Sequence, residues 1–274
     1  MQRDSMANTF AVALVLCGVC SLIVSASAVG LKPFQDKNKA LDIQKNIIAA
    51  AGLAGDEALT AKRVDEIFKN IERKLVNLET GEYVEDGAEG GKIKLDTYDS
   101  RKAAKDPTLN APTKGAQFDI GISAREKYAF AYLVKDDKGT LTQLVLPIYG
   151  KGLWSTMYGF IALEKDLKTV KGLTFYEHGE TPGLGGEIES AQFKNAWPGK
   201  KVYDGAAEDA NIKFGVKKGS PEGDEKNYLV DGLSGATITS RGVDQLLKYW
   251  VSDSGFGKFL KKLSAEQGGS NVGA

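Results

Sequence analysis

The first feature of the hydrophobic pattern is a long apolar run. From Thr9 to Gly30 no residue is charged. A helix of about 22 residues, rising 1.5 Å per residue, spans a hydrocarbon core of roughly 30 Å. The pattern therefore predicts one transmembrane helix over residues 9–30, preceded by a short polar tail over residues 1–8.

A cleavable signal peptide is the competing interpretation of this run. Ala26-Ser27-Ala28 has the small-x-small pattern of a cleavage site, and residues 10–24 form an apolar centre of suitable length. The residues before that centre are only weakly basic, because Asp4 offsets Arg3. This balance favours a retained membrane anchor.

The apolar positions after residue 31 have helical spacing at first. Residues 35–51 place apolar side chains on one stripe, and residues 60–69 repeat the pattern over a shorter length. Residues 75–84 indicate a hairpin around Glu79-Thr80-Gly81. Residues 85–112 are rich in Gly, Lys and Asp with little periodicity, and they predict a long surface loop.

The pattern then becomes typical of strands. Two hairpins are expected, and the segments assigned to strands are 128–135 with 141–149, 157–163 with 170–176, and the shorter 212–216 and 228–230. A short helix is expected at 190–195, and helical segments follow at 243–251 and 259–263. The prediction is an α+β fold with a mostly antiparallel sheet and flanking helices. One domain covers residues 31–274, with an N-terminal helical part at 35–74 and a C-terminal helix at 240–264.

Composition excludes several functions. Lys and Arg together number 36, as do Asp and Glu, so no basic surplus points to nucleic acid. Cys17 and Cys20 both lie in the apolar run, so the remainder has no disulfide and no thiolate metal site. His178 is the single histidine and has no evident acid partner for a Ser-His-Asp triad. The sequence has neither a Walker loop nor a Rossmann fingerprint.

The most informative stretch is Asp231–Ser240, which joins a strand-like run to a helix-like run. Its two glycines allow a positive φ and the close approach of a ligand. Exposed N–H groups at such a joint, beside the start of a helix, form an anion-binding site. The alternative is a simple turn in which Thr239 or Ser240 is the helix N-cap.

Two more glycine-rich segments follow strand-like runs. They are residues 150–155 and residues 178–186. If these segments and residues 231–240 meet at the strand ends, they form a pocket for a flat ligand.

The motif residues also carry a resemblance. Asp231-Gly-Leu-Ser-Gly-Ala-Thr237 resembles the flavinylation motif, in which the last hydroxyl is joined to FMN by a phosphoester. His178-Gly-Glu-Thr-Pro-Gly-Leu-Gly185 resembles a second signature of the same family, the C subunits of bacterial Na⁺-translocating NADH:quinone reductases. The resemblance covers nearly the whole chain. The G subunits of Rnf electron-transport complexes are related and share the first motif.

The resemblance implies the roles of individual residues. Thr237 holds FMN covalently, and Ser234, Gly235 and neighbouring N–H groups such as that of Ala236 bind its phosphate. Lys218 supplies a cation to that phosphate, although its match to the family pattern is looser. Trp154, with Ser155 beside it, flanks the isoalloxazine ring, and the ring edge is lined by Glu180, Thr181, Leu184 and Gly185. The alternatives from the residues alone are a core position for Trp154, and a solvated loop carboxylate or a helix-start residue for Glu180. No role is assigned to His178.

The function that the resemblance implies is electron transfer. The chain relays electrons from NADH toward ubiquinone through covalent FMN, coupled to Na⁺ export, within a complex of other membrane and peripheral subunits. A flavin transferase installs FMN from FAD with Mg²⁺, releasing AMP. The alternatives are an Rnf-type subunit with ferredoxin as donor, and a membrane-tethered binding module without flavin.

The resemblance also implies a location. The chain is a single-pass protein of the bacterial inner membrane with its flavin domain in the periplasm. Charge alone indicates the opposite orientation, because lysines follow the apolar run at Lys32, Lys37, Lys39 and Lys45. The positive-inside rule would leave such a flank in the cytoplasm, although the rule weakens for a large translocated domain.

Overall fold

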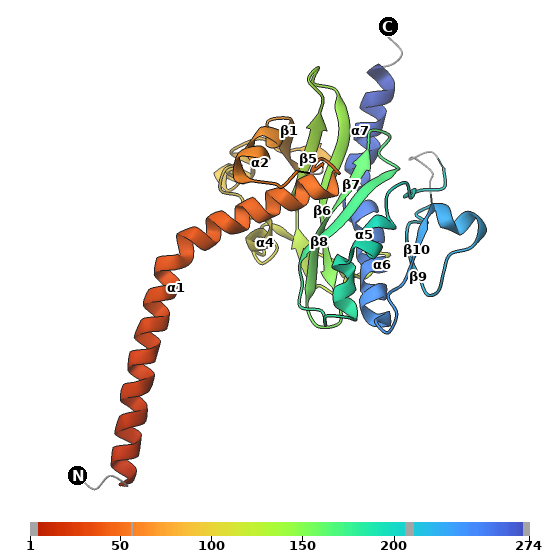
Figure 1. Ribbon diagram of the computed structural model, residues 1–274. Helices are drawn as coiled ribbons and strands as arrows, with labels where there is room; N and C mark the ends of the chain where they lie inside the picture. The colour runs from red at the N-terminus through yellow and green to blue at the C-terminus, as the bar shows by residue number, and fades with distance from the viewer. Residues whose placement is uncertain (1–4, 56, 206–210, 271–274) are drawn as a thin grey trace. The chain divides into compact units, whose positions relative to one another are not determined.

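The computed structural model describes residues 5–55, 57–205 and 211–270, and it divides the chain into two units after Gln44. The first unit belongs to helix α1, which runs from Met6 to Ala50 (Figure 1). Among the described residues, α1 is the one helix long and apolar enough to cross a membrane. Its large apolar side chains, such as Phe10 and Leu22, are exposed.

The helices expected at 9–30 and 35–51 are parts of one continuous helix, α1, which contains Pro33, and the apolar run 9–30 within it stays a candidate membrane span. Proline removes one hydrogen bond, yet its φ is compatible with a helix, so a single proline need not end one. The predicted polar tail, residues 1–8, is already helical at Met6, and residues 1–4 lie outside the described part of the chain.

The second unit begins at Lys45, not at residue 31. Residues 31–40 of α1 are exposed, whereas Ile47, Ile48 and Ala50 at its end are buried in the second unit. The carbonyl oxygen of Ala50 lies directly against Gly172, where there is no room for a side chain.

A six-stranded sheet is the centre of this unit. Its spatial order is β2-β1-β5-β6-β7-β8, and every neighbouring pair is antiparallel. The strands are β1 (Ile71–Asn77), β2 (Glu82–Tyr83), β5 (Tyr128–Lys135), β6 (Leu141–Lys151), β7 (Thr156–Glu164) and β8 (Val170–Glu177). The three predicted hairpins are confirmed, and so is the α+β class. The predicted helical part over 35–74 is too long, because β1 begins at Ile71.

Two C-terminal helices pack on this sheet: α6 (Thr237–Val251) and α7 (Gly257–Ser270). They confirm the helical segments expected at 243–251 and 259–263, whereas a single helix over 240–264 is wrong. Helix α6 begins three residues before residue 240, and the chain turns between Ser252 and Phe256. At Gly255 a Cβ atom would lie 2.6 Å from Cα of Trp250, so this turn requires glycine.

Glycines also let α6 lie close to β6. A Cβ atom on Gly150 would lie 2.7 Å from Cβ of Leu246, and one on Gly242 would meet the carbonyl oxygen of Lys151. The indole Nε1 of Trp250 donates a 2.7 Å hydrogen bond to the carbonyl of Tyr149. These contacts position the start of α6 beside the end of β6.

The segment predicted as a surface loop, residues 85–112, has more structure than expected. It contains α3 (Ala88–Gly91), α4 (Ser100–Ala103) and β3 (Asn110–Pro112), which pairs with β4 (Ala124–Glu126). Ile93 is fully buried in a small core with Leu75 and Phe130. Leu95, Tyr98 and Leu109 pack against the same core, but their irregular spacing in a polar stretch has no helical or strand periodicity, so the pattern gave no signal for this packing.

The remaining elements are short. Helix α2 (Ala61–Phe68) confirms the helix expected at 60–69, and α5 (Ala191–Asn195) confirms the one at 190–195. Two 3₁₀ turns are η1 (Gly185–Glu189) and η2 (Gly223–Asn227). Strands β9 (Gly215–Lys217) and β10 (Leu229–Asp231) form a separate parallel pair.

A buried carboxyl group lies at the end of β4. The hydroxyl of Tyr149 donates a hydrogen bond to Glu126, whose side chain is buried. The neighbouring Arg125 directs its hydrogen bonds elsewhere: Nε donates to the hydroxyl of Tyr249 and the carbonyl of Ser254, and Nη1 donates to the backbone carbonyl of Glu126. Its charge offsets only part of the burial effect on Glu126. Burial raises the pKa of Glu126 from 4.5 to about 7.

This shift predicts a pH-dependent stability. Between about pH 4.5 and pH 7 the unfolded chain ionises Glu126 while the folded chain keeps it neutral, so stability falls as pH rises. Glu126→Gln stays neutral and keeps an acceptor for Tyr149. Urea unfolding of the full-length chain at several pH values should therefore show the wild type losing stability relative to Glu126→Gln, by a few kcal/mol in order of magnitude. A difference in unfolding free energy between the two proteins that does not change with pH would contradict the raised pKa of Glu126.

Candidate functional site

Thr237 is the first residue of α6. Ala236 precedes it as the N-cap and supplies no side-chain hydrogen bond, while Gly235 has a φ of +71°. The first N–H groups of a helix have no intrahelical acceptor and carry partial positive charge. The hydroxyl of Thr237 is thus presented beside uncapped N–H groups, an arrangement suited to an anion.

The N-cap assignment in the alternative interpretation of this joint is wrong, whereas the turn that it predicted is present, because the N–H of Ala236 donates to the carbonyl of Leu233 at 3.2 Å. Thr239 and Ser240 were candidate N-caps, but both lie inside the first turn of α6 and are buried. Oγ of Ser240 accepts a 2.9 Å hydrogen bond from the N–H of Leu233, so it attaches the segment between β10 and α6 to the first turn of α6.

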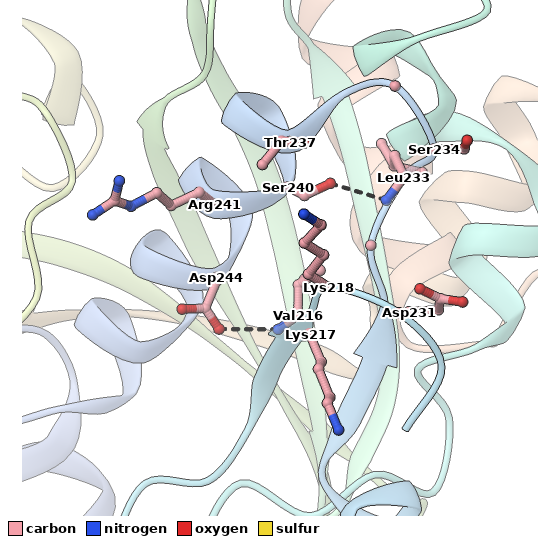
Figure 2. A pocket seen from close by; sticks show the side chains of 13 residues that line it. Val216, Lys217, Lys218, Asp231, Leu233, Ser234, Thr237, Ser240, Arg241 and Asp244 are labelled. Carbon is pink, nitrogen blue, oxygen red and sulfur yellow. Dashed lines mark hydrogen bonds between the residues drawn. The ribbon is translucent and has the colours of Figure 1, made fainter. Parts of the chain in front are cut away.

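Two cavities meet at Gly235 and Thr237, which line both of them. The larger has a volume of about 530 Å³ and lies between α6 and the β9–β10 pair (Figure 2). We call it the cationic cavity, lined by Val216, Lys217, Lys218, Gly219, Asp231, Gly232, Leu233, Ser234, Gly235, Thr237, Ser240, Arg241 and Asp244. The smaller, the apolar cavity, has a volume of about 230 Å³ and is lined by Leu153, Trp154, Glu180, Thr181, Leu184, Gly185, Gly235, Ala236, Thr237, Ile238 and Thr239.

The cationic cavity contains two positive charges without ion pairs in the described structure, Lys218 and Arg241. The side chain of Lys218 extends toward Thr237 and Ser240, whereas that of Lys217 points the other way (Figure 2). Nζ of Lys217 lies 2.6 Å from Glu225. Sequence reasoning missed Arg241, although its position four residues after Thr237 places it on the same side of the helix.

The charge of Asp244 in this cavity is already balanced. Its carboxylate accepts from the N–H of Val216 at 3.0 Å and lies 2.8 Å from Nζ of Lys248. Asp231 accepts from the hydroxyl of Ser220 at 2.9 Å, and Figure 2 shows its carboxylate directed away from Thr237. The cavity therefore has a net positive character.

The apolar cavity exposes four large hydrophobic side chains to solvent. Leu153 is 44% exposed, Trp154 66%, Leu184 44% and Ile238 58%. The structure thus contradicts a core position for Trp154. Exposed apolar side chains gathered around one hollow favour a flat, apolar ligand.

A single carboxylate joins the elements that surround this cavity. Oε1 of Glu180 accepts from the N–H groups of Trp154 at 2.9 Å and Ser155 at 3.2 Å, and Oε2 accepts from that of Leu153 at 3.1 Å. Oε2 also accepts from the hydroxyl of Thr239 at 2.6 Å. Glu180 thereby connects the segment before β7 to the first turn of α6.

This carboxylate is buried and charged, so the solvated-loop alternative for Glu180 is wrong. Burial alone would raise the pKa of Glu180, but the hydroxyl of Thr239 and the N–H groups of Trp154, Ser155 and Leu153 stabilise the ionised form and lower the pKa below 4.5. Two glycines provide the space for this carboxylate. A Cβ atom on Gly152 would lie 2.6 Å from Oε1 of Glu180, and a Cβ atom on Gly185 would lie 2.6 Å from Oγ1 of Thr239.

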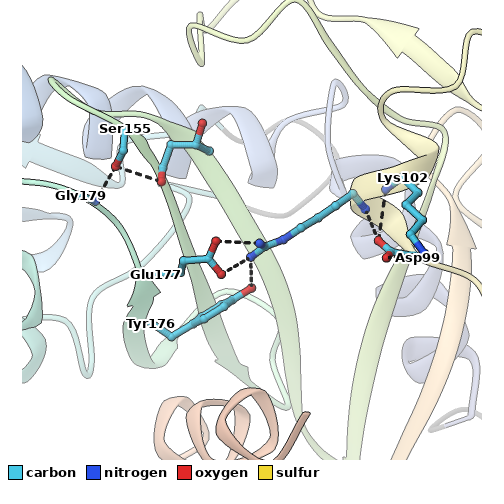
Figure 3. A network of polar contacts seen from close by, with 8 residues as sticks. Asp99, Lys102, Ser155, Tyr176, Glu177 and Gly179 are labelled. Carbon is cyan, nitrogen blue, oxygen red and sulfur yellow. Dashed lines mark hydrogen bonds and ion pairs between the residues drawn. The ribbon is translucent and has the colours of Figure 1, made fainter. Parts of the chain in front are cut away.

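A second network holds the start of the glycine-rich segment 178–186 (Figure 3). Oγ of Ser155 accepts from the N–H of Gly179 at 2.6 Å. Arg101, from α4, donates to both carboxylate oxygens of Glu177 at 2.8 and 3.0 Å and lies 3.7 Å from the ring centre of Tyr158. These contacts attach the end of β8 to α4 and β7.

The structure brings most of the predicted site residues together. Ser234 and Lys218 line the cationic cavity, Trp154, Glu180, Thr181, Leu184, Gly185 and Ala236 line the apolar one, and Gly235 and Thr237 line both. Ser155 lines neither, because its hydroxyl is directed to Gly179. Nδ1 of His178 accepts from the N–H of Glu180 at 3.1 Å, and its Nε2 lies 3.0 Å from Glu189.

Comparison with known proteins identifies the class. Residues 152–252 match the family model described as FMN-binding domain. This range contains Trp154, Glu180 and helix α6, whose first turn lines both cavities. The fold and this match define an FMN-binding domain of the α+β class.

The particular family follows from longer matches. The chain is 46% identical over 267 residues to the C subunit of the Na⁺-translocating NADH-quinone reductase of Haemophilus ducreyi, covering 97% of each chain. It is 44% identical to the corresponding C subunit of Pseudomonas aeruginosa, covering 95% of this chain and 97% of that one. The crystal structure of NqrC from Shewanella oneidensis matches with a TM-score of 0.70 at 34% identity, covering 82% of this chain and 97% of that chain. The chain belongs to this family of C subunits.

The Glu180 contacts generate a prediction about local stability. In Glu180→Ala the N–H groups of residues 153–155 lose a charged acceptor worth about 1.5–3 kcal/mol per bond. Hydrogen exchange of these amides in the full-length chain should accelerate tenfold or more, while Glu187→Ala, an exposed carboxylate in the same segment, should change nothing. Equal protection in Glu180→Ala and wild type would contradict the role given to Glu180.

The same carboxylate predicts an acid-sensitive contribution. Because its folded-state pKa is lowered, Glu180 stabilises the fold above pH 4.5 and loses this contribution as pH falls through the folded value. The difference in unfolding free energy between wild type and Glu180→Ala should therefore shrink below about pH 4. Urea titrations at pH 7 and pH 3 measure it, and a constant difference would argue against an ionised Glu180.

Proposed function

We propose that Thr237 carries FMN through a phosphoester and that the chain is the electron-carrying C subunit of a Na⁺-translocating NADH:quinone reductase. The observation that supports it most directly is the position of Thr237 at the boundary between a cationic and an apolar cavity. FMN has the same division, with an anionic phosphate at one end and a flat aromatic ring at the other.

Each cavity has the chemistry that one end of FMN requires. Uncapped N–H groups at the start of α6, with Lys218 and the hydroxyl of Ser234, suit the phosphate. Trp154 and Leu184 offer apolar surfaces for the ring, and Thr181, Gly185 and the segment held by Glu180 complete that cavity. FMN supplies the redox chemistry, and the chain supplies its attachment and position.

The attachment reaction consumes the Thr237 hydroxyl. A flavin transferase using FAD and Mg²⁺ would form the bond between Oγ of Thr237 and the FMN phosphorus, break the phosphoanhydride bond and release AMP. The hydroxyl proton passes to a base. Thr237 is exposed, which this transfer between two proteins requires.

The place of the chain in electron transfer follows from its family. We propose that NADH oxidation and ubiquinone reduction belong to other membrane and peripheral subunits, and that this chain relays electrons between them, coupled to Na⁺ export. The similarity to C subunits of Na⁺-translocating reductases favours this complex over an Rnf-type complex. Helix α1 fits a single-pass inner-membrane protein, and we propose that the flavin domain faces the periplasm.

Substitution of Thr237 tests the attachment. The full-length chain, produced together with a flavin transferase, should gain the mass of FMN minus water and show a fluorescent band on a denaturing gel. Thr237→Ala should lose both, and Thr237→Ser should keep them because it retains a hydroxyl. Ser234→Ala, which removes a hydroxyl from the same cavity, should also keep them. Denaturation-resistant FMN in Thr237→Ala would refute the assignment.

A further inference from the structure

Arg241 has no role in the site so far. It follows Thr237 by four residues on α6, so both residues occupy the same side of the helix, one turn apart. Its side chain lines the cationic cavity and is exposed, and the described part of the chain shows no ion pair to it. Arginine in such a position is suited to a phosphate, because its planar guanidinium presents several donors.

Lys218 approaches the same threonine from a different element. It follows β9, whose pairing with β10 puts Lys217 opposite Asp231. In Figure 2 Lys218 extends toward the first turn of α6, whereas the guanidinium of Arg241 is directed away from Lys218 and from the Asp231–Ser234 segment. The two cations come from different elements and both line the cationic cavity, and to meet a phosphate on Thr237 the exposed side chain of Arg241 has to turn toward Lys218.

The other charges of the cavity are occupied. Glu225 neutralises Lys217, and Lys248 with the N–H of Val216 satisfies Asp244. Asp231 accepts a hydrogen bond from the hydroxyl of Ser220 and keeps its negative charge, but its carboxylate is directed away from Thr237 (Figure 2). Lys218 and Arg241 are thus the positive charges of this cavity without an ion pair among the described residues.

We propose that Lys218 and Arg241 bind the flavin phosphate together, so that the site binds FMN more tightly than unphosphorylated riboflavin even where no covalent bond is formed. This inference rests on the proposed function and adds Arg241 as a specificity-determining residue. A phosphate monoester carries a charge of about −1.5 to −2 at pH 7, which two cations and the uncapped N–H groups balance. Riboflavin has the same ring but lacks that charge, so it loses these contacts and keeps those of the apolar cavity.

The test uses the full-length chain in detergent, made without flavin transferase and with Thr237→Ala, so that no bond to FMN can form. Quenching of flavin fluorescence measures the Kd for FMN and for riboflavin. FMN should bind at least about tenfold more tightly, since hydrogen bonds between charged partners are stronger than those between neutral groups. Adding Arg241→Gln should weaken FMN binding about tenfold and leave riboflavin unchanged.

Two further variants separate a specific contact from general charge. Arg241→Lys keeps the charge and should retain part of the preference. Lys217→Gln removes a charge from the same cavity wall, but that charge already faces Glu225, so the preference should persist. An unchanged ratio of the two Kd values in Arg241→Gln would overturn the proposal, as would an equal loss for FMN and riboflavin.

The outcome is independent of the covalent assignment. Mass spectrometry of the chain with Thr237 intact decides whether Thr237 is the acceptor, whereas the affinity ratio is measured without any covalent bond. If Thr237 is not the acceptor, the preference for FMN still tests Arg241. If Thr237 is the acceptor and the ratio does not change in Arg241→Gln, only the role of Arg241 fails.

Discussion

The site depends on one buried carboxylate. Glu180 accepts three N–H groups from residues 153–155 and the hydroxyl of Thr239, and so it sets the distance between the segment that carries Trp154 and the helix that carries Thr237. Close packing of Gly242 against Lys151 and Gly152 brings the same two parts of the chain together, and the carboxylate adds hydrogen bonds to residues 153–155. Without this carboxylate the Trp154 segment and α6 would lose these hydrogen bonds, and the width of the apolar cavity beside Thr237 would no longer be fixed by them.

The fold explains why the start of α6 is available for a ligand. Gly150 and Gly242 let α6 lie directly on β6, and Trp250 attaches it by a hydrogen bond, so the helix needs no capping side chain to be held in place. Its first N–H groups then remain free to meet an anion. Strands β9 and β10 add the wall that carries Lys218, and Asp244 attaches that wall to α6. The position of Thr237 is therefore set by the packing of α6 on β6, whereas the charge of Lys218 is supplied by the β9–β10 pair.

The sequence predicted the hairpins and the α+β class because alternating apolar residues and turn residues are local signals. It predicted where the glycine-rich segments lie, but not that Glu180 joins two of them, because a contact 59 residues apart leaves no periodic trace. The exposure of Trp154, the burial of Ile93 and the continuity of α1 through Pro33 depend on tertiary packing. Arg241 was missed because an exposed arginine on a helix is usually only solvated.

The most direct measurement of the central claim is electron density for the flavin-loaded chain. The account predicts continuous density from Oγ of Thr237, with the phosphate toward Lys218 in the cationic cavity and the isoalloxazine ring beside Trp154 and Leu184. Flavin density that is separate from Thr237, or a ring that occupies the cationic cavity, would contradict it.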